Sequence, residues 1–524
     1  MQTQVVQAAF PWLTVLILLA AVAALALWVI PPLRKVARGY ALAVSVVILV
    51  LYVVALGTGF SIDQGAAVQL AEKYTWIPSI GASVAWGVNG VGAVMVLLAV
   101  FLVPVVVLAA WDDFSGDRAA GYFGWILFLE AIMIALFAAR DVFLFYIFFE
   151  LMIVPMYFLI GRYGGAGREK AAMKFLLYSI LGGLIMLVGV IGLYVEGPQG
   201  PDNYLLDTLT GGLSLDSGVQ MLFFLSFFIG FAIKAPMWPV HTWLPDTTEK
   251  APAGTSTLLV GVLDKLGTFG MIAICLPLFP DAAKAAAPWI IALAIISIFW
   301  GALLAITSDN LMRLVAYTSV SHFGFMVMGI FSGSSVAMNG AILYMVAHGV
   351  GTAGLFLIVG FLGKRGNSHN ISAYGGWQRV TPVLAGTFMI AGLATIALPG
   401  LSGFVPEYMV LMGTFSVSKL AAMVAVVGVV LAAVYILLPY QRAFTGPKPE
   451  GLDVKDLNGR EKTVMGILIA AMLFLGFYPA SVLNAVDAVA NDTAAYVAVD
   501  GGMAQGLLGD TLLDANLTAE GSTK

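Results

Sequence analysis

Residues 222–246 read LFFLSFFIGFAIKAPMWPVHTWLPD, an apolar run followed by a lysine and three prolines. Proline lacks a backbone N–H and clashes with the preceding helical turn, so this segment predicts a helix that breaks just after Lys234. Inside a bilayer, such a break is tolerated where its backbone groups line a hydrated cavity or are buried in protein. We therefore predict a polar pocket at the break, with Lys234 as its switchable charge.

The composition sets this segment in a membrane protein. Hydrophobic residues make up 60% of the 524 residues and charged residues 10%, and the mean hydropathy is +0.97. Soluble domains carry about 25% charged residues. Because a spanning helix needs about 20 apolar residues, we predict an all-α polytopic membrane protein with about 14 transmembrane helices, the first of them retained. The predicted spans lie near 11–31, 40–59, 91–111, 121–139, 142–161, 175–195, 219–244, 255–279, 287–306, 311–331, 337–362, 382–415, 420–440 and 463–482.

Lysine and arginine concentrate in alternate loops, as expected for cytoplasmic loops. The loop at 196–218 and the C-terminal tail are instead acidic. This pattern predicts that both termini lie on the periplasmic side, and the Ala, Val and Gly richness favours a bacterial plasma membrane. The residues assigned to cytoplasmic loops are Arg34, Lys35, Arg38, Arg162, Arg168, Lys170, Lys174, Lys364, Arg365, Arg379, Arg442, Lys448, Lys455, Arg460 and Lys462.

Sequence signals for cofactor binding are absent. The single Cys275 cannot supply the thiolates of an iron–sulfur cluster, and no dinucleotide or nucleotide motif occurs in a suitable context. The four histidines lack metal-ligand spacing. We therefore expect no cofactor on this chain and no nucleic-acid partner, with lipids around it and energy supplied by a partner protein.

Several ionisable residues fall inside the predicted spans. A charge at bilayer depth costs on the order of 3 kcal/mol, so each such residue is a candidate functional group. The main candidates are Glu150, Lys234, Lys265, His348 and Glu407, and the weaker ones are His322 and Glu130.

Each candidate also has a structural interpretation. Lys234 could reach the headgroups along its aliphatic stem. Glu150 could be a neutral, hydrogen-bonded carboxyl, and the histidines could be satisfied core residues. Lys265 follows Asp264, but neighbours on a helix point about 100° apart, which favours separate partners for the two side chains.

A second helix break is predicted at 397–409, which reads ALPGLSGFVPEYM and contains Glu407. Two broken helices in matching halves are typical of inverted repeats with an ion or proton path at mid-depth. We therefore divide the chain into N-terminal helices 1–3 with an external loop, a first repeat, a second repeat, a cytoplasmic loop with the last helix, and an acidic external tail. Their boundaries are 1–120, 121–280, 281–441, 442–482 and 483–524.

Four motifs together resemble the antiporter-like membrane subunits of proton-pumping NADH:quinone oxidoreductase, respiratory complex I. The resemblance runs from about 125 to 440, and the second motif is long and specific. Because Glu407 stands where chains L and N and the cation/proton antiporter subunits typically carry lysine, the chain looks most like chain M, the counterpart of mitochondrial subunit 4. The motifs are FFELMIVPMYFLIGRYG, KAPMWPVHTWLPDTTEKAPAGTSTLLVGVLDKLGTFG, LMRLVAYTSVSHFGFMVMG and LPGLSGFVPEYMVL.

The resemblance implies roles for the buried residues. Glu150 would pair with Lys234, Lys265 would be the central lysine, and Glu407 would be the terminal acid of a hydrated proton path. His322 and His348 would connect the central lysine to the far side. Asp264 departs from relatives that often carry an apolar residue there, and the resemblance gives it no role.

The resemblance also implies partners. These are the other membrane subunits of complex I, especially chains L and N, with flavin and iron–sulfur clusters in further subunits. Alternative interpretations are a subunit of a multi-subunit sodium/proton antiporter, a subunit of a membrane-bound hydrogenase complex, or a non-pumping structural subunit whose polar residues only hold helices together.

Overall fold

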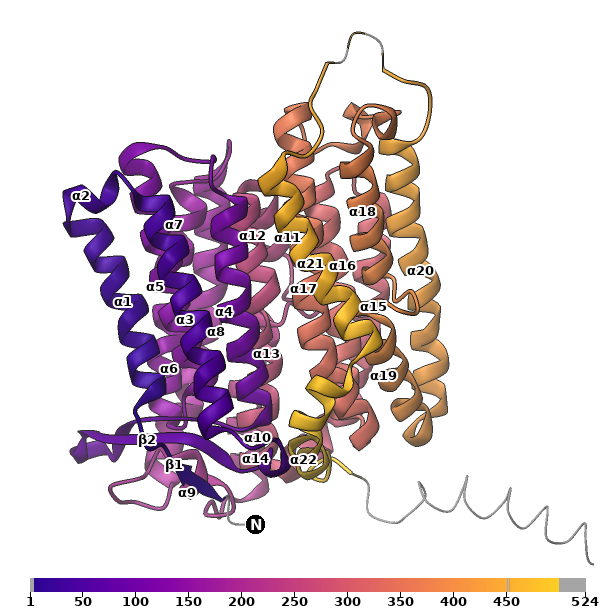
Figure 1. Ribbon diagram of the computed structural model, residues 1–524. Helices are drawn as coiled ribbons and strands as arrows, with labels where there is room; N and C mark the ends of the chain where they lie inside the picture. Colours follow the sequence, from indigo (N-terminus) through magenta and orange to yellow (C-terminus); the bar gives the residue numbers. More distant parts are fainter. Residues whose placement is uncertain (1–3, 450, 452, 499–524) are drawn as a thin grey trace, which may run out of the picture.

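The computed structural model describes residues 4–449, 451 and 453–498, which form a bundle of helices aligned along one axis (Figure 1). Within this described part, twelve helices are long and apolar enough to cross a membrane. They are α1 (Trp12–Val29), α3 (Ala37–Gly59), α4 (Gly90–Ala109), α5 (Gly116–Ala138), α6 with α7 (Val142–Leu151, Ile153–Gly161), α8 (Arg168–Glu196), α10 (Ser217–Lys234), α12 to α14 (Ala253–Leu278), α15 (Pro280–Thr307), α16 (Leu311–Phe331), α17 (Ser335–Gly366) and α20 (Lys419–Phe444).

The predicted count of about 14 is approximate because two of the expected spans are interrupted. The stretch expected at 463–482 is α21 (Gly459–Phe477), bent by 61° from α22 (Ala480–Ala494), and this pair brings the count in the described residues to as many as 13. The stretch expected at 382–415 forms two shorter apolar helices, α18 (Pro382–Thr395) and α19 (Phe404–Val417).

Both predicted helix breaks are present. The first separates α10 from α11 (Trp243–Lys250), and the second separates α18 from α19. Gly400 in the second break has a φ of 90°, a left-handed conformation that suits glycine. In Figure 1 the pair α10–α11 runs up the bundle and the pair α18–α19 runs down it, as expected for inverted repeats.

The helix α12 to α14 is itself irregular. It consists of α12 (Ala253–Leu258), a π-helical turn η3 (Leu259–Leu263), α13 (Lys265–Gly270), a second π-helical turn η4 (Met271–Cys275) and α14 (Leu276–Leu278). Such π-turns are rare and frequently occur at functional sites.

A small three-stranded sheet, which the all-α prediction omitted, covers one end of the bundle (Figure 1). Strand β2 (Val68–Ile77) pairs in parallel with β1 (Val5–Gln7) and antiparallel with β3 (Ala82–Val88). Glu72 of β2 accepts a 2.8 Å hydrogen bond from the backbone N–H of Leu13, so it satisfies a free donor in the first turn of α1.

Short elements complete the ends of the bundle. They are α2 (Pro31–Arg34), η1 (Ile62–Gln64), η2 (Pro78–Ile80), α9 (Leu206–Leu209), η5 (Ile371–Ala373) and η6 (Trp377–Arg379).

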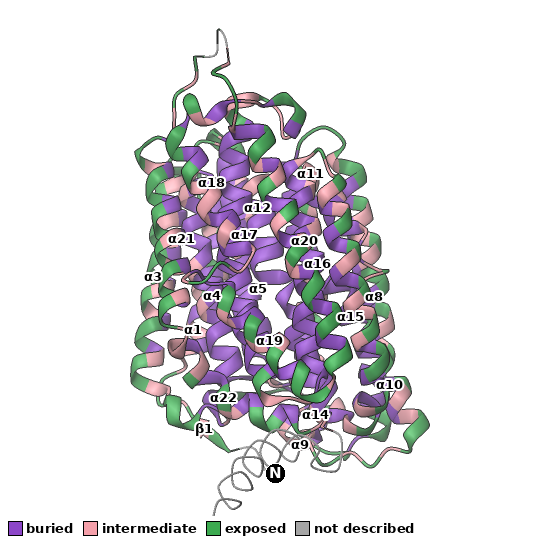
Figure 2. Ribbon diagram, turned by 90° about the vertical axis from the view of Figure 1, so that its right-hand side faces the viewer, coloured by how far each residue is buried: buried purple, intermediate pink, exposed green. Residues whose placement is uncertain are grey.

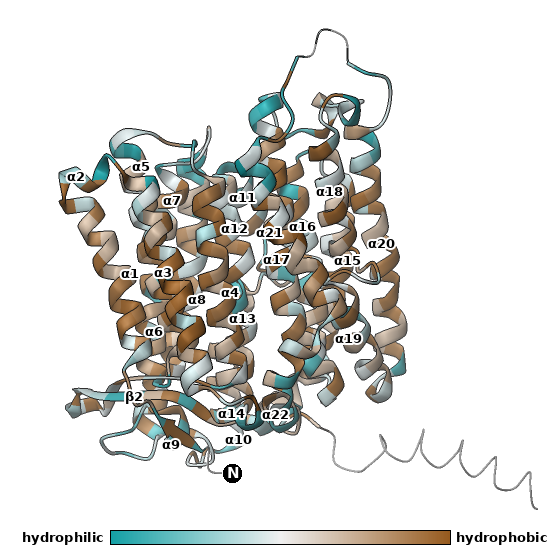
Figure 3. Ribbon diagram, in the orientation of Figure 1, coloured by the Kyte–Doolittle hydropathy of each residue, from teal (hydrophilic) through white to brown (hydrophobic). Residues whose placement is uncertain are grey.

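The described chain begins and ends on the same side of the bundle, where β1 and α22 lie (Figure 1). The opposite end carries α2, α11 and the connection between α20 and α21, which include many of the basic loop residues, and it is strongly hydrophilic in Figure 3. The acidic tail predicted from residue 483 begins within α22, and its part at 499–524 lies outside the described residues.

Helix α17 forms the centre of the fold. Its most apolar window is 100% buried, whereas that of α3 is 28% buried. In Figure 2, α3, α8, α15 and α20 carry much of the exposed surface around the buried interior. The polar side chains of Asn339, His348 and Thr352 on α17 are therefore buried within protein.

Candidate functional site

The first break places Lys234 at the end of α10 and provides partners for several nearby backbone groups. The N–H of Ala235 bonds to the carbonyl of Phe231 at 2.7 Å, and the N–H of Trp238 bonds to Ser297 Oγ at 2.9 Å. Trp243 Nε1 donates to the carbonyl of Ile233 at 2.9 Å. Polar groups that a broken helix would otherwise leave without partners are thus satisfied.

The Lys234 ammonium is buried and held by aromatic rings. Its side chain is 2% exposed, and Nζ lies 5.2 Å from the ring centre of Phe175 and 5.7 Å from that of Trp243. Nζ has no hydrogen-bond partner among the described residues. This enclosure argues against a side chain that extends to the membrane surface, and it leaves the ammonium stabilised mainly by cation–π contacts and distant carboxylates.

Glu150 lies on α6 and packs against the backbone of α8. A Cβ at Gly183 would be 1.6 Å from Glu150 Oε1, so only glycine leaves room for this carboxyl. Within the described part of the chain, Oε1 has no hydrogen-bond partner and no ion pair joins Glu150 to Lys234 within 4.0 Å. The close pair implied by the resemblance is therefore open here, and the two groups interact only at longer range.

Asp264 directly precedes Lys265 at the start of α13. It is fully buried, and neither carboxylate oxygen has a hydrogen-bond partner in the described part of the chain. Lys234 and Lys265 are the basic groups whose charges interact with it. The sequence assigned no role to this residue.

Lys265 contacts His348 directly. Lys265 Nζ lies 2.6 Å from His348 Nδ1, donates a hydrogen bond to the carbonyl of Val260, and lies 5.2 Å from the ring centre of Phe323. In the preceding π-turn the N–H of Asp264 bonds to Leu259, five residues earlier. The widened turn brings the carbonyl of Val260 within reach of the lysine side chain.

The polar contacts continue from His348 to Glu407. The rings of His348 and His322 are 5.2 Å apart between centroids, and His322 Nε2 lies 3.0 Å from the hydroxyl of Tyr435. The ring of His322 is 5.8 Å from that of Tyr344, whose hydroxyl donates to Glu407 Oε2 at 2.7 Å. All five side chains are buried.

A small cavity lies beside the histidines at the second break. Its volume is about 10 Å³, and its lining includes His322, Tyr344 and His348 together with Thr395 and Gly403 of the broken segment. A space of this size holds about one water molecule where polar partners surround it. This cavity lies at the second break, whereas the polar pocket predicted around Lys234 at the first break stays a prediction.

The six predicted site residues thus fall into two groups. Lys265, His348, His322 and Glu407 lie along one line of contacts, whereas Lys234 and Glu150 lie at the first break without direct contact to each other. Glu130 on α5 is fully buried, and neither of its carboxylate oxygens has a hydrogen-bond partner among the residues described.

The sequence analysis missed two tyrosines. Tyr344 lies four residues before His348 on α17, and this spacing places both on one helix face, a signal that could have identified it. Tyr435 is one of two tyrosines in the apolar helix α20, and no pattern in the sequence indicates which way its side chain points.

A network of ion pairs fixes α11 at the hydrophilic end of the bundle. Asp246 bonds to Lys174 and to Arg313, each at 2.6 Å, and Arg313 also bonds to Glu249 at 2.9 Å. These contacts connect α11 to α8 and α16, and they hold the second half of the broken helix in place. A groove of about 570 Å³ beside the network is lined by Lys174, Asp246 and Glu249.

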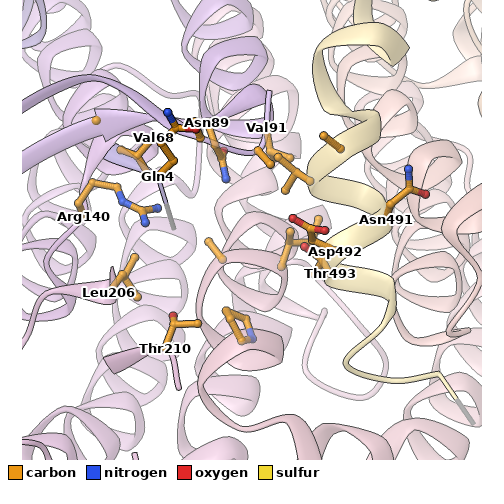
Figure 4. Close-up of a pocket in the computed structure, with 18 of the residues that line it drawn as sticks. Gln4, Val68, Asn89, Val91, Arg140, Leu206, Thr210, Asn491, Asp492 and Thr493 are labelled. Carbon is orange, nitrogen blue, oxygen red and sulfur yellow. The ribbon is translucent and has the colours of Figure 1, made fainter. Parts of the chain in front are cut away.

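A larger cavity of about 710 Å³ lies at the opposite end, between the sheet and α22 (Figure 4). Its lining includes Asn89, Arg140 and Asp492, and Arg140 pairs with Asp207 at 2.5 Å. None of the six predicted site residues lines this cavity.

Comparison with known proteins matches nearly the whole chain. Residues 139–432 match the family described as NADH:quinone oxidoreductase/Mrp antiporter, TM. The NADH-quinone oxidoreductase subunit M of Mycobacterium tuberculosis (strain CDC 1551 / Oshkosh) is 43% identical over 521 residues, covering 92% of this chain and 94% of that protein. The subunit M of Rhodobacter capsulatus is 37% identical over 491 residues, covering 92% and 95%.

Solved structures with the same fold include a chain of respiratory complex I from Thermus thermophilus with bound NADH. Its TM-score is 0.84 at 29% identity, with 93% of this chain and all of that chain covered. A chain of the Mrp complex from Dietzia sp. DQ12-45-1b has a TM-score of 0.80 at 20% identity, covering 93% and 99%, and at this identity the likeness concerns the fold alone.

Proposed function

This chain belongs to the NADH:quinone oxidoreductase/Mrp antiporter family of transmembrane proteins, and we propose that its buried polar line carries protons across the membrane. It is an antiporter-like, multi-pass subunit of the NADH-quinone oxidoreductase complex, similar to subunit M, as the motifs in its sequence predicted. The proposal that this subunit itself transfers protons rests on its buried polar side chains.

The observation that carries the proposal is the line from Lys265 through His348 and His322 to Glu407. The contact between Lys265 and His348 is 2.6 Å, and hydroxyls of Tyr435 and Tyr344 lie beside His322 and Glu407. Every member can hold or relay a proton. Keeping so many ionisable groups inside apolar helices is costly, and proton relays are the common reason for retaining them.

In the proposed transfer, Lys265 gives a proton to His348 Nδ1. The proton then passes to His322, and it reaches Glu407 through the nearby hydroxyls and the single-water cavity at the second break. The first transfer follows a direct contact of 2.6 Å, and the later ones pass between side chains whose rings lie 5.2 and 5.8 Å apart.

The open arrangement of Glu150 and Lys234 supports a switch at the start of this route. At an effective dielectric constant of 20, an opposite charge 4 Å away is worth about 4 kcal/mol. Moving one charge against 100 mV costs about 2.3 kcal/mol. A movement of Glu150 toward or away from Lys234 is therefore large enough to hold or release one proton against the membrane potential.

The proposal includes the surroundings of the chain. Its neighbours are the antiporter-like chains L and N, with lipid on the remaining surface, and the exposed apolar residues Leu177, Trp289 and Leu420 suit such contacts. The membrane is a bacterial plasma membrane with both termini on the periplasmic side. The flavin and the iron–sulfur clusters belong to other subunits, and this chain contributes proton transfer without a redox centre.

The experiment compares Glu150→Gln with wild type in inverted membrane vesicles after assembly of the complex is verified. NADH-driven quinone reduction and proton uptake are measured in the same preparation. We expect both to fall in the Glu150 variant and to persist in Glu169→Gln, because Glu169 is 73% exposed at the start of α8.

Unchanged quinone reduction and proton uptake in an assembled Glu150→Gln complex would overturn the assigned switch. Sodium-dependent proton movement without NADH would instead support the alternative of an antiporter subunit.

A further inference from the structure

We propose that Asp264 carries the proton between Lys234 and Lys265, and this inference rests on the proposed proton-transfer function. Asp264 is the residue that joins the π-turn η3 to α13, immediately before Lys265, where the line of polar contacts begins. The family resemblance gave this position no role.

The helix packing places Asp264 toward the break. A Cβ at Gly267 would lie 2.5 Å from the backbone N of Ala235 and 2.4 Å from the carbonyl of Phe231, so α13 meets the end of α10 directly at Gly267. Asp264 precedes Gly267 by three residues, which puts it on the same face one turn away. Its carboxylate is therefore presented to the end of α10, where Lys234 lies.

The neighbouring residue faces the other way. Successive side chains on a helix point about 100° apart around its axis. Lys265 therefore points away from Asp264, and it contacts His348 on α17. One short helix thus presents a carboxylate to the first repeat and an amine to the second. The two adjacent side chains join the break to the buried line.

The surroundings of Asp264 suit a group that changes its charge. Both carboxylate oxygens are buried and lack hydrogen-bond partners in the described chain, while Lys265 is the next residue and Lys234 ends the helix that packs against Gly267. Fully buried Asp141 provides the contrast, because it accepts backbone hydrogen bonds of 2.9 Å from Ser83 and Leu144. Asp141 is fixed as a helix cap, whereas Asp264 has only the lysines to compensate its charge.

The transfer has two balanced steps. An N–H bond of the Lys234 ammonium breaks and an O–H bond forms on Asp264, which leaves a neutral amine beside a neutral acid. The O–H bond then breaks as an N–H bond forms on neutral Lys265, and the carboxylate is regenerated. Each step runs directly or through one water molecule, and the intermediate between the two steps carries no net charge on Lys234, Asp264 or Lys265.

The test uses the assembled complex carrying Asp264→Asn, Asp264→Glu or Asp264→Leu, with proton uptake and NADH-driven quinone reduction measured together. We expect about a tenfold loss in the Asn and Leu variants, the low end for removing a proton-transfer group, and substantial recovery with Glu. A purely structural polar role would be met by Asn. We expect the Leu variant to assemble as well, because the Asp264 carboxylate that it removes makes no hydrogen bond in the described chain.

Wild-type rates in an assembled Asn or Leu variant would overturn this inference. Lys265→Ala in the same membranes distinguishes a failure of the Asp264 role from a failure of the proposed proton-transfer function. If Lys265→Ala is inactive while Asp264→Asn is active, only the role of Asp264 fails. If both are active, the proposed function fails as well.

Discussion

Lys265 Nζ lies 2.6 Å from His348 Nδ1, and this contact joins the first predicted repeat to the second. Lys265 belongs to α13 beside the first break, whereas His348 belongs to the fully enclosed helix α17, close to the second break. A proton that leaves the first half of the bundle therefore has a direct acceptor in the other half.

Replacing His348 by Leu should interrupt this junction. We expect at least a tenfold loss of proton-coupled quinone reduction, because the leucine cannot accept the proton of Lys265. The measurement is NADH-driven quinone reduction in membranes with verified assembly. His369→Gln is the matched control, since His369 lies outside the buried line. Equal rates in the two variants would show that the contact is only structural.

Gly183→Ala should displace the Glu150 carboxyl without removing it. The added methyl carbon would lie 1.6 Å from Oε1, so the carboxyl must move, and we expect coupled activity to fall several-fold. Gly218→Ala in α10 is the control, because a Cβ there has no neighbour within 4 Å. If Gly183→Ala retains the activity of the control, the position of Glu150 is unimportant.

Tyr344→Phe removes the hydrogen bond to Glu407 and leaves the ring in place. We expect a loss of activity smaller than that of Glu407→Gln, because the carboxyl remains able to hold a proton. The two residues are in contact at 2.7 Å, so the double variant should lose less than the sum of the two free-energy costs. Strict additivity in a double-mutant cycle would contradict a shared role.

Arg365 stabilises the connection between α17 and α21. It donates to both carboxylate oxygens of Glu461, at 2.6 and 3.2 Å, and Glu461 also accepts from the N–H of Asn458. Arg365→Met leaves the buried carboxylate uncompensated and should lower the free energy of unfolding by about 3 kcal/mol. Lys73→Met removes a more exposed pair with Asp202 and should cost at most about 1 kcal/mol. The midpoint of thermal unfolding of the purified complex is measured for both variants. A larger loss of stability in Lys73→Met than in Arg365→Met would contradict the stabilising role given to Arg365.

The sequence was sufficient to predict most of the spans and both breaks, because lipid requires long apolar helices and proline interrupts them. It was not sufficient to predict the sheet at 68–88, where polar and apolar residues mix without a clear period. It also selected Lys265, His348, His322 and Glu407, since charged or polar groups are rare inside apolar helices.

Contacts across the bundle could not be predicted in the same way. The separation between Glu150 and Lys234 depends on how α6 packs against Gly183, and Tyr435 reaches His322 from a helix far along the chain. Such distances follow from helix packing and rotation, which a single sequence does not specify.

The most direct test of the central claim is the rate of NADH oxidation, measured together with the rate of proton uptake, in vesicles that carry Lys265→Met. Lys419→Met, at the exposed start of α20, is the control. If the buried line carries protons, NADH oxidation and proton uptake both fall at least tenfold in the Lys265 variant and stay at wild-type values in the control. An assembled Lys265→Met complex with both rates at wild-type values would contradict the account.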